Sequence, residues 1–288
     1  MSELRPRRSV LYMPAANERA LEKAKAIAAD ALIFDLEDAV APDAKAQARA
    51  NAVAAAASGD YGRREITIRC NGLDTPWGAD DIVAAATSGA AAIVIPKVGS
   101  SDDLDRIEQQ LDAAGAPAEL SIWAMIETPG ALLDIRSIAH HRRVAVLVMG
   151  TNDLIKELRT VALADRSPLL PHLATALVGA READKVILDG VYNDVRDPDG
   201  FRAEAEQGKA FGFDGKTLIH PSQVEPTNEV WAPTADEVEF SRRVIEAFEA
   251  AEAEGRGVIT VDGRMIENLH VDNARRVLAV ADAIAALG

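Results

Sequence analysis

Short apolar runs alternate with longer amphipathic or alanine-rich stretches along the first 220 residues. The runs are rich in Val, Ile and Leu and bounded by Gly or Pro, which is typical of buried parallel strands. Eight strands are predicted, at residues 9–14, 31–34, 65–69, 91–95, 121–127, 144–153, 186–188 and 215–219. Eight strands that alternate with helices predict an α/β fold, a single (β/α)8 TIM barrel. The alternative is a doubly wound sheet, but the chain has no G-x-G-x-x-G motif to favour it.

The pattern changes after the eighth strand. A charged helix is predicted at residues 234–253 and an amphipathic helix at residues 268–287, with a glycine-punctuated link between them. Because the barrel is closed by then, we expect a TIM-barrel catalytic domain at residues 1–230 and a C-terminal helical extension at residues 231–288. The extension is expected to pack on the barrel or on a neighbouring subunit.

Two successive predicted strands end on carboxylates, Glu127 and Asp153. A carboxylate at the end of a buried strand is costly to desolvate unless a cation or hydrogen bonds meet it. Two of them can converge on one Mg²⁺ ion, which takes oxygen ligands and leaves positions for water and substrate. The alternative is that each residue caps the helix that follows, since acids favour the first turn of a helix.

Other polar residues stand at the predicted strand ends, where barrel enzymes carry their active sites. The full set is Asp35, Glu37, Asp38, Arg69, Asn71, Lys97, Glu127, Asp153, Asp189 and His220. Acids combined with an arginine and a lysine predict a metal site that also binds a carboxylate, which Arg69 would hold bidentately. Alternatively, Arg69 forms an ion pair with the acids of the second strand, and these acids support Arg69 or metal-bound water.

Composition narrows the classes of function. The chain has 288 residues, of which 48% are hydrophobic, and a net charge of −15. Nucleic-acid binding through a basic surface is therefore not expected, and an anionic substrate requires local Arg or Lys side chains. Cys70 is the single cysteine, so no internal disulfide can form and a cytoplasmic location is expected. No membrane partner is expected, because the chain has no long apolar run and no apolar signal core at its N-terminus.

Two other motifs are set aside. Gly215-Lys216-Thr217 resembles the end of a phosphate-binding loop, but Ala210 replaces the earlier glycine and the segment is predicted as a strand. His140 and His141 lie at a predicted helix end, and no zinc site is expected there because no cysteine or suitably spaced histidine joins them.

Six segments occur in an order that resembles a known family. They are RSVLYMP at residues 8–14, FDLEDAV at 34–40, RCN at 69–71, IPK at 95–97, ETPG at 127–130 and FDGK at 213–216. The set resembles the citrate lyase beta subunit and malyl-CoA lyase-like proteins of the HpcH/HpaI aldolase group, from about residue 8 to residue 280. The resemblance implies a TIM barrel that binds Mg²⁺ and cleaves a carbon–carbon bond in a 3-hydroxyacyl-CoA.

The resemblance also implies roles for individual residues. Lyases of this family carry Met-Ile-Asp or a close variant in the tail, and its aspartate is thought to act from a neighbouring subunit. The matching residue here is Glu267, whose side chain is one methylene longer. A homotrimer or hexamer is therefore expected, with Glu267 as the acid–base group. The predicted site consists of catalytic Arg69, Glu267, Asp35 and Glu37, substrate-binding Arg69, Lys97 and Asn71, and metal ligands Glu127 and Asp153.

The predicted reaction is Mg²⁺-dependent retro-Claisen cleavage of a malyl-, citramalyl- or citryl-CoA type substrate into a 2-oxo acid and an acyl-CoA. The segment GTND at residues 150–153 differs from the Gly-x-Glu-Asp of citrate lyase beta chains, which favours a stand-alone enzyme. Two alternatives stay open: a metal-dependent aldolase on free hydroxy-oxo acids, and a non-catalytic or complex-dependent subunit similar to citrate lyase beta. Thioester hydrolysis could also follow cleavage in such a site.

Overall fold

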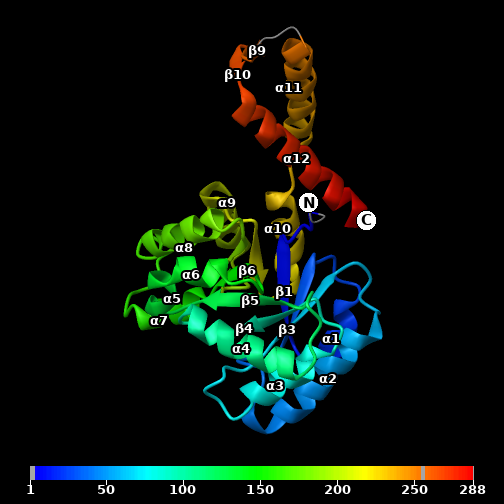
Figure 1. Ribbon diagram of the computed structural model, residues 1–288, viewed down its shortest axis with the longest axis vertical. Helices are drawn as coiled ribbons and strands as arrows, with labels where there is room; N and C mark the ends of the chain where they lie inside the picture. The colour runs from blue at the N-terminus through cyan, green and yellow to red at the C-terminus, as the bar shows by residue number, and fades with distance from the viewer. Residues whose placement is uncertain (1–3, 254–256, 288) are drawn as a thin grey trace. The chain divides into compact units, whose positions relative to one another are not determined.

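The computed structural model describes residues 4–253 and 257–287 (Figure 1). The chain forms two compact units, one of residues Arg7–Val230 and one that contains the chain from Trp231 onward. Each unit has its own hydrophobic core, so each is described by itself.

The first unit is a closed barrel of parallel strands in sequence order, so the predicted TIM barrel is confirmed. Its strands are β1 (Ser9–Pro14), β2 (Ala31–Asp35), β3 (Glu65–Arg69), β4 (Ala92–Ile95), β5 (Ser121–Ile126), β6 (Val144–Met149), β7 (Val186–Asp189) and β8 (Gly215–Leu218). Pairing of β1 with β8 closes the barrel. The register of β2 against β3 pairs Asp35 with Arg69, which places an acid beside an arginine where both strands end.

Helices surround the strands, as the helical periodicity between the apolar runs predicts. The α-helices of the first unit are α1 (Glu18–Ala24), α2 (Lys45–Ser58), α3 (Gly78–Ala86), α4 (Ser101–Ala113), α5 (Pro129–Leu133), α6 (Ile135–His140), α7 (Thr151–Glu157), α8 (Leu170–Glu182), α9 (Pro198–Phe211) and α10 (Val224–Trp231). Short 3-10 turns lie at η1 (Pro42–Ala44) and η2 (Pro221–Gln223). No described helix has both the length and the hydrophobicity needed to cross a membrane.

The barrel interior is filled by side chains from alternate strand positions. Ala31 and Ile33 on β2 belong to this core with Trp123 and Met125 on β5, and Trp123 is fully buried. Because successive side chains of a strand point to opposite faces, residues two apart share the interior face. The filled interior leaves the C-terminal strand ends as the place for a site.

The C-terminal unit contains α11 (Ala235–Ala253), β9 (Ile259–Val261), β10 (Arg264–Ile266) and α12 (Asn268–Leu287). Both helices were predicted, but the link was not expected to form an antiparallel hairpin. Asp262 and Gly263 make its turn, and both have positive φ, at 49° and 76°. An Asp-Gly pair with two positive φ angles suits a two-residue hairpin, because this backbone matches the strand twist.

Candidate metal and substrate site

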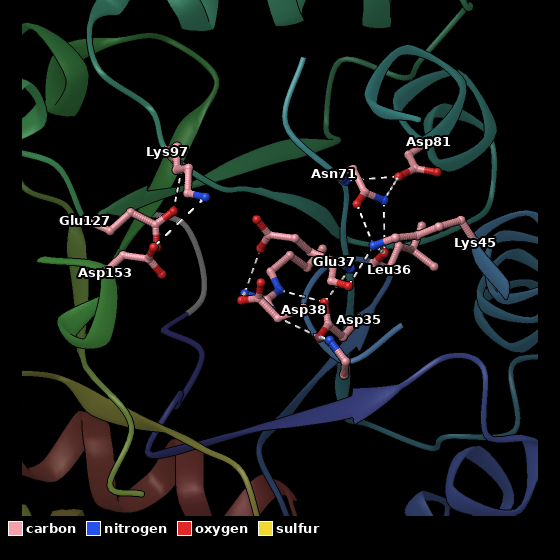
Figure 2. A network of polar contacts seen from close by, with 12 residues as sticks. Asp35, Leu36, Glu37, Asp38, Lys45, Asn71, Asp81, Lys97, Glu127 and Asp153 are labelled. Carbon is pink, nitrogen blue, oxygen red and sulfur yellow. Dashed lines mark hydrogen bonds and ion pairs between the residues drawn. The ribbon is translucent and has the colours of Figure 1, made fainter. Parts of the chain in front are cut away.

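Glu127 and Asp153 line the same cavity of about 330 Å³ at the C-terminal ends of the strands. Glu127 directly follows β5. Asp153 was predicted to end a strand, but β6 stops at Met149 and Asp153 lies in the first turn of α7. Gly150 leaves the extended conformation between them, which ends the strand and begins the helix. Figure 2 shows the two carboxylates side by side next to Lys97.

The side chain of Glu127 is held firmly from two sides. The main-chain N–H of Lys97 donates to its Oε1 at 2.6 Å. Gly150 lies against the rest of the side chain so closely that a Cβ at this position would overlap Glu127, including Oε2. Oε1 is thus hydrogen-bonded to the main chain, and Oε2 lies so close to residue 150 that only a glycine fits there.

Burial raises the pKa of Glu127 to about 7, against a lowering by the hydrogen bond from Lys97 and a further rise from the nearby Asp153 charge. Glu127 is only 2% exposed. A buried carboxylate beside a second carboxylate is stabilised by a cation, and hard oxygen donors of this kind suit Mg²⁺. The residues present therefore fit the predicted metal.

The helix-capping alternative fits less well. Thr128, not Glu127, caps α5, since its side chain accepts from the N–H of Ala131. At the start of α7 the cap residue is Gly150, and no side-chain capping bond is made by the described residues there. Asp153 does sit in a first turn, where its charge also favours the helix dipole.

Arg69 lines the same cavity, but its guanidinium group already contacts the acids that follow β2. Nε and Nη2 donate to the two oxygens of Asp35, each at 2.7 Å. Nη1 lies 2.9 Å from Glu37 and 3.3 Å from Asp38. The structure thus shows the ion pairs that were the alternative to a bidentate grip on substrate. Substrate contact by Arg69 has to involve Nη1, the second N–H of Nη2 or the guanidinium face, because Asp35 occupies the edge formed by Nε and Nη2.

The acids at the end of β2 and in the β2–α2 loop differ in their hydrogen bonds and in their exposure to solvent. Asp35 also accepts from the N–H groups of Glu37 and Ala39, so both of its oxygens are saturated. Burial raises the pKa of Glu37 to about 8, although Arg69 lowers it. Asp38 is largely exposed and lines the cavity. These contacts favour a supporting role for Asp35, beside Arg69, over direct proton transfer.

Lys97 and Asn71 were both predicted to bind substrate. Neither is among the described residues that line the cavity. Lys97 Nζ lies 4.0 Å from Asp153, and its side chain is half exposed. Asn71 is buried, and its amide bonds to Lys45 Nζ and to Asp81. Substrate contact by these two residues stays a prediction, and the arrangement of Asn71 does not favour it.

Three neighbours of the site were missed. Tyr12 lies under Arg69, with the guanidinium carbon 4.8 Å from the ring centre. Nζ of Lys45 donates to the main-chain oxygen of Leu36 in the β2–α2 loop, and the lack of a side chain at Gly150 leaves space for Glu127. Tyr12 and Lys45 gave no signal because an aromatic in a strand and a lysine in an alanine-rich helix have ordinary structural explanations. Only the glycine between β6 and α7 could have been recognised as a tight approach.

Two other polar residues of the predicted ring do not enter the cavity. Asp189 is fully buried and pairs with Arg166 and Lys216, at 2.7 and 3.1 Å. Lys216 belongs to β8, so the segment Gly215-Lys216-Thr217 is a strand as expected. His220 accepts from the N–H of Ser222 and caps η2.

His141 does have carboxylate neighbours, which the sequence did not reveal. Its Nε2 lies 3.3 Å from Asp105 and 3.7 Å from Glu108. Glu108, however, already binds Arg142 and Arg143. Two guanidinium groups on that carboxylate disfavour a further cation, so we assign no metal to this cluster.

Glu267 follows β10 in the C-terminal unit and is partly buried. Its N–H donates to Nδ1 of His270 at 3.2 Å. Its predicted action on the barrel of another subunit is not visible in a single chain and stays a prediction.

Residues 8–221 match the family model described as HpcH/HpaI aldolase/citrate lyase. The chain belongs to the HpcH/HpaI aldolase/citrate lyase family. The predicted membership in this lyase family is thereby confirmed.

Two relatives from this family span nearly the whole chain. A (3S)-malyl-CoA thioesterase of Cereibacter sphaeroides is 50% identical over 98% of this chain and 97% of its own length. The citrate lyase subunit beta of Escherichia coli is 37% identical over 96% of this chain and 94% of its own length.

Solved structures of other proteins agree with the barrel. CitE from Mycobacterium tuberculosis, in complex with magnesium, acetoacetate and coenzyme A, has a TM-score of 0.78 and 27% identity, covering 97% of this chain and 100% of that chain. A citrate lyase from Burkholderia xenovorans has a TM-score of 0.85 at 19% identity, covering 99% and 94%, which supports the fold alone.

Proposed function

We propose that this protein is a Mg²⁺-dependent enzyme that acts on a 3-hydroxyacyl-CoA of the malyl type. The observation that carries the proposal is the pair of carboxylates, Glu127 and Asp153, in one cavity with Arg69. The relative of known structure that binds magnesium, acetoacetate and coenzyme A supports the same ligand classes. The higher identity to malyl-CoA thioesterases than to citrate lyase beta subunits favours malyl over citryl substrates.

Glu127 and Asp153 would hold the metal, which supplies Lewis-acid polarisation of a bound oxygen. Arg69 would neutralise the carboxylate of the oxo-acid portion through Nη1, in competition with Glu37 and Asp38. Asp35 would keep the guanidinium in place. A partly enclosed cavity strengthens these interactions because it limits competing water.

The first candidate reaction is carbon–carbon cleavage. The hydroxyl passes its proton to water, its oxygen becomes the carbonyl of the 2-oxo acid, and the electron pair of the broken carbon–carbon bond moves to the α-carbon of the thioester. That carbon must then accept a proton. We assign this proton to Glu267 of an adjacent subunit in a homotrimer or hexamer.

The second candidate is hydrolysis of the thioester, which adds water across the acyl–sulfur bond and releases a hydroxy acid and free CoA. The full-length relatives named malyl-CoA thioesterases favour it. Glu267 also favours hydrolysis, because its side chain is longer than that of the usual aspartate and would place the acid needed for cleavage differently.

Product analysis tests the proposal and separates its two forms. Purified protein with Mg²⁺ is incubated with malyl-CoA, citramalyl-CoA and citryl-CoA, and 2-oxo acid, acyl-CoA and free thiol are measured. Glyoxylate with acetyl-CoA from malyl-CoA supports cleavage, and malate with free thiol and no glyoxylate supports hydrolysis. Activity on free hydroxy-oxo acids alone would favour the simple aldolase. Inactivity on all substrates would favour a subunit that works only in a complex.

A further inference from the structure

Lys45 is a buried lysine whose ammonium group is fully used by neutral oxygens. It lies on α2 and is 6% exposed. Nζ donates to the main-chain oxygens of Leu36 and Glu37, both at 2.7 Å, and to Oδ1 of Asn71 at 2.8 Å. An ammonium has three donors, so each is engaged (Figure 2).

Burying an ammonium costs several kcal/mol of desolvation, which its hydrogen bonds have to offset. What the ammonium adds is a further connection between two loops, which the side-chain amide of Asn71 also joins by donating to the main-chain oxygen of Leu36 at 2.9 Å. Leu36 and Glu37 lie in the β2–α2 loop, and Asn71 follows β3. The ring of Trp77, 5.2 Å from Nζ, also lies against the ammonium.

The Asn71 end of this connection is itself anchored. Both the N–H and the side-chain amide of Asn71 donate to Oδ2 of Asp81, at 2.9 and 2.6 Å. Asp81 in turn accepts from Nε of Arg49 at 2.7 Å. The acceptor for Lys45 is therefore held by charged hydrogen bonds that run back to α2 and α3.

The other end of the connection reaches the substrate cavity. Glu37 binds Lys45 through its main-chain oxygen and Arg69 Nη1 through its carboxylate, at 2.9 Å. Asp38, the next residue, also faces Nη1. Through these two contacts the loop orients the guanidinium of Arg69 at Nη1, the nitrogen that Asp35 does not bind.

We propose that Lys45 is a positioning residue, which fixes the acid loop of Leu36–Asp38 and, through Glu37 and Asp38, the orientation in which Arg69 faces the carboxylate of the oxo-acid. The role rests on the proposed function, because it acts through Arg69. It also reassigns Asn71, which serves as the anchor of Lys45 and not as a substrate ligand.

The test compares Lys45→Met, Lys45→Ala and the control Lys25→Met by calorimetric titration with Mg²⁺ and then pyruvate. Lys25 also lies over an aromatic ring, that of Tyr61, but pairs with Glu22 and Asp60 away from the cavity lining. Lys45→Met should keep Mg²⁺ affinity close to that of the parent and lose about 10- to 100-fold in pyruvate affinity, the usual effect of removing a supporting partner. Lys25→Met should bind pyruvate like the parent.

Chemical rescue separates positioning from simple stabilisation. In Lys45→Ala, added ethylammonium should enter the vacated space and restore pyruvate affinity along with thermal stability. Unchanged pyruvate affinity in Lys45→Met, or an amine that restores stability without affinity, overturns the positioning role. A parent that binds Mg²⁺ but no oxo-acid overturns the proposed function itself, and the positioning role with it.

Discussion

The main-chain N–H of Lys97 donates to Oε1 of Glu127 at 2.6 Å, and it does so from a left-handed backbone with φ of 52°. Non-glycine residues rarely adopt this conformation, and it is found where the surrounding structure enforces it. The bond fixes the carboxylate before any ligand arrives. A metal ligand oriented in advance loses less conformational freedom on binding.

Gly150→Ala should disrupt the proposed metal site with a smaller effect on the fold. The new methyl group would overlap Glu127 and push its carboxylate out of place. We expect Mg²⁺ affinity to fall roughly 10- to 100-fold. Titration calorimetry measures this, with Gly130→Ala as the control, since a Cβ there meets only ordinary contacts. Equal losses in both variants would contradict the tight fit described for Gly150.

Mg²⁺ affinity should rise with pH between about 6 and 8. Burial raises the pKa of Glu127 to about 7 in the metal-free protein, and only the carboxylate form binds a metal. Titrations at several pH values should therefore show tighter binding at higher pH. In Glu127→Gln any residual affinity should lose this dependence, and a parent affinity that is flat across the range would count against the buried carboxyl.

The same group should make the metal-free protein less stable as pH rises. The folded state binds the Glu127 proton more tightly than the unfolded chain, whose carboxyl has the ordinary pKa of 4.5. Unfolding free energy therefore falls as pH rises from about 4.5 towards 7. Glu37 acts in the same direction, with a pKa raised to about 8. Thermal unfolding from pH 5 to pH 8 should show the decline, and Glu127→Gln should show less of it.

The sequence predicted the barrel and the neighbourhood of the site because both depend on short-range patterns. Alternating apolar runs located the strands, and strand ends located Glu127 and Arg69. The place of Asp153 was approximately right, although it lies on a helix, because α7 follows β6 immediately.

The hydrogen-bond partners of the polar residues could not be predicted from the sequence. Whether Arg69 faces substrate or Asp35 depends on the register between β2 and β3, which pairs the two residues directly. Lys45 and Asn71 meet only after folding brings the two loops together. Asp189 looked like Glu127 in sequence, yet Arg166 and Lys216 neutralise it. Such charge pairing is a three-dimensional property without a local signal.

Arg69→Lys should weaken oxo-acid binding while the protein still folds. Lysine keeps the charge, but a single ammonium group cannot bond both oxygens of Asp35 and also contact Glu37 and Asp38, as the guanidinium does. Loss of charged hydrogen bonds should lower the free energy of unfolding by roughly 1–3 kcal/mol. Thermal unfolding and titration with pyruvate, glyoxylate and oxaloacetate measure the two effects. Oxo-acid affinities equal to those of the parent would make Arg69 a structural residue.

Glu267→Gln should reduce turnover by about two or more orders of magnitude, the scale of a general acid–base group, with Mg²⁺ and oxo-acid affinity nearly unchanged. Mixing this variant with Arg69→Lys tests action between subunits. Mixed oligomers should regain activity, because some sites combine an intact Arg69 with an intact Glu267 from different chains. Verified subunit exchange without any regain would exclude a shared site.

We propose that Glu127 and Asp153 together form a metal site that holds the oxo-acid. Calorimetric titration of Mg²⁺, followed by pyruvate, into the parent, Glu127→Gln and Asp153→Asn tests it most directly. The parent should bind both ligands, and each variant should lose Mg²⁺ and pyruvate binding together, since the oxo-acid is held through the metal. Parent-like Mg²⁺ affinity in both variants would contradict the claim.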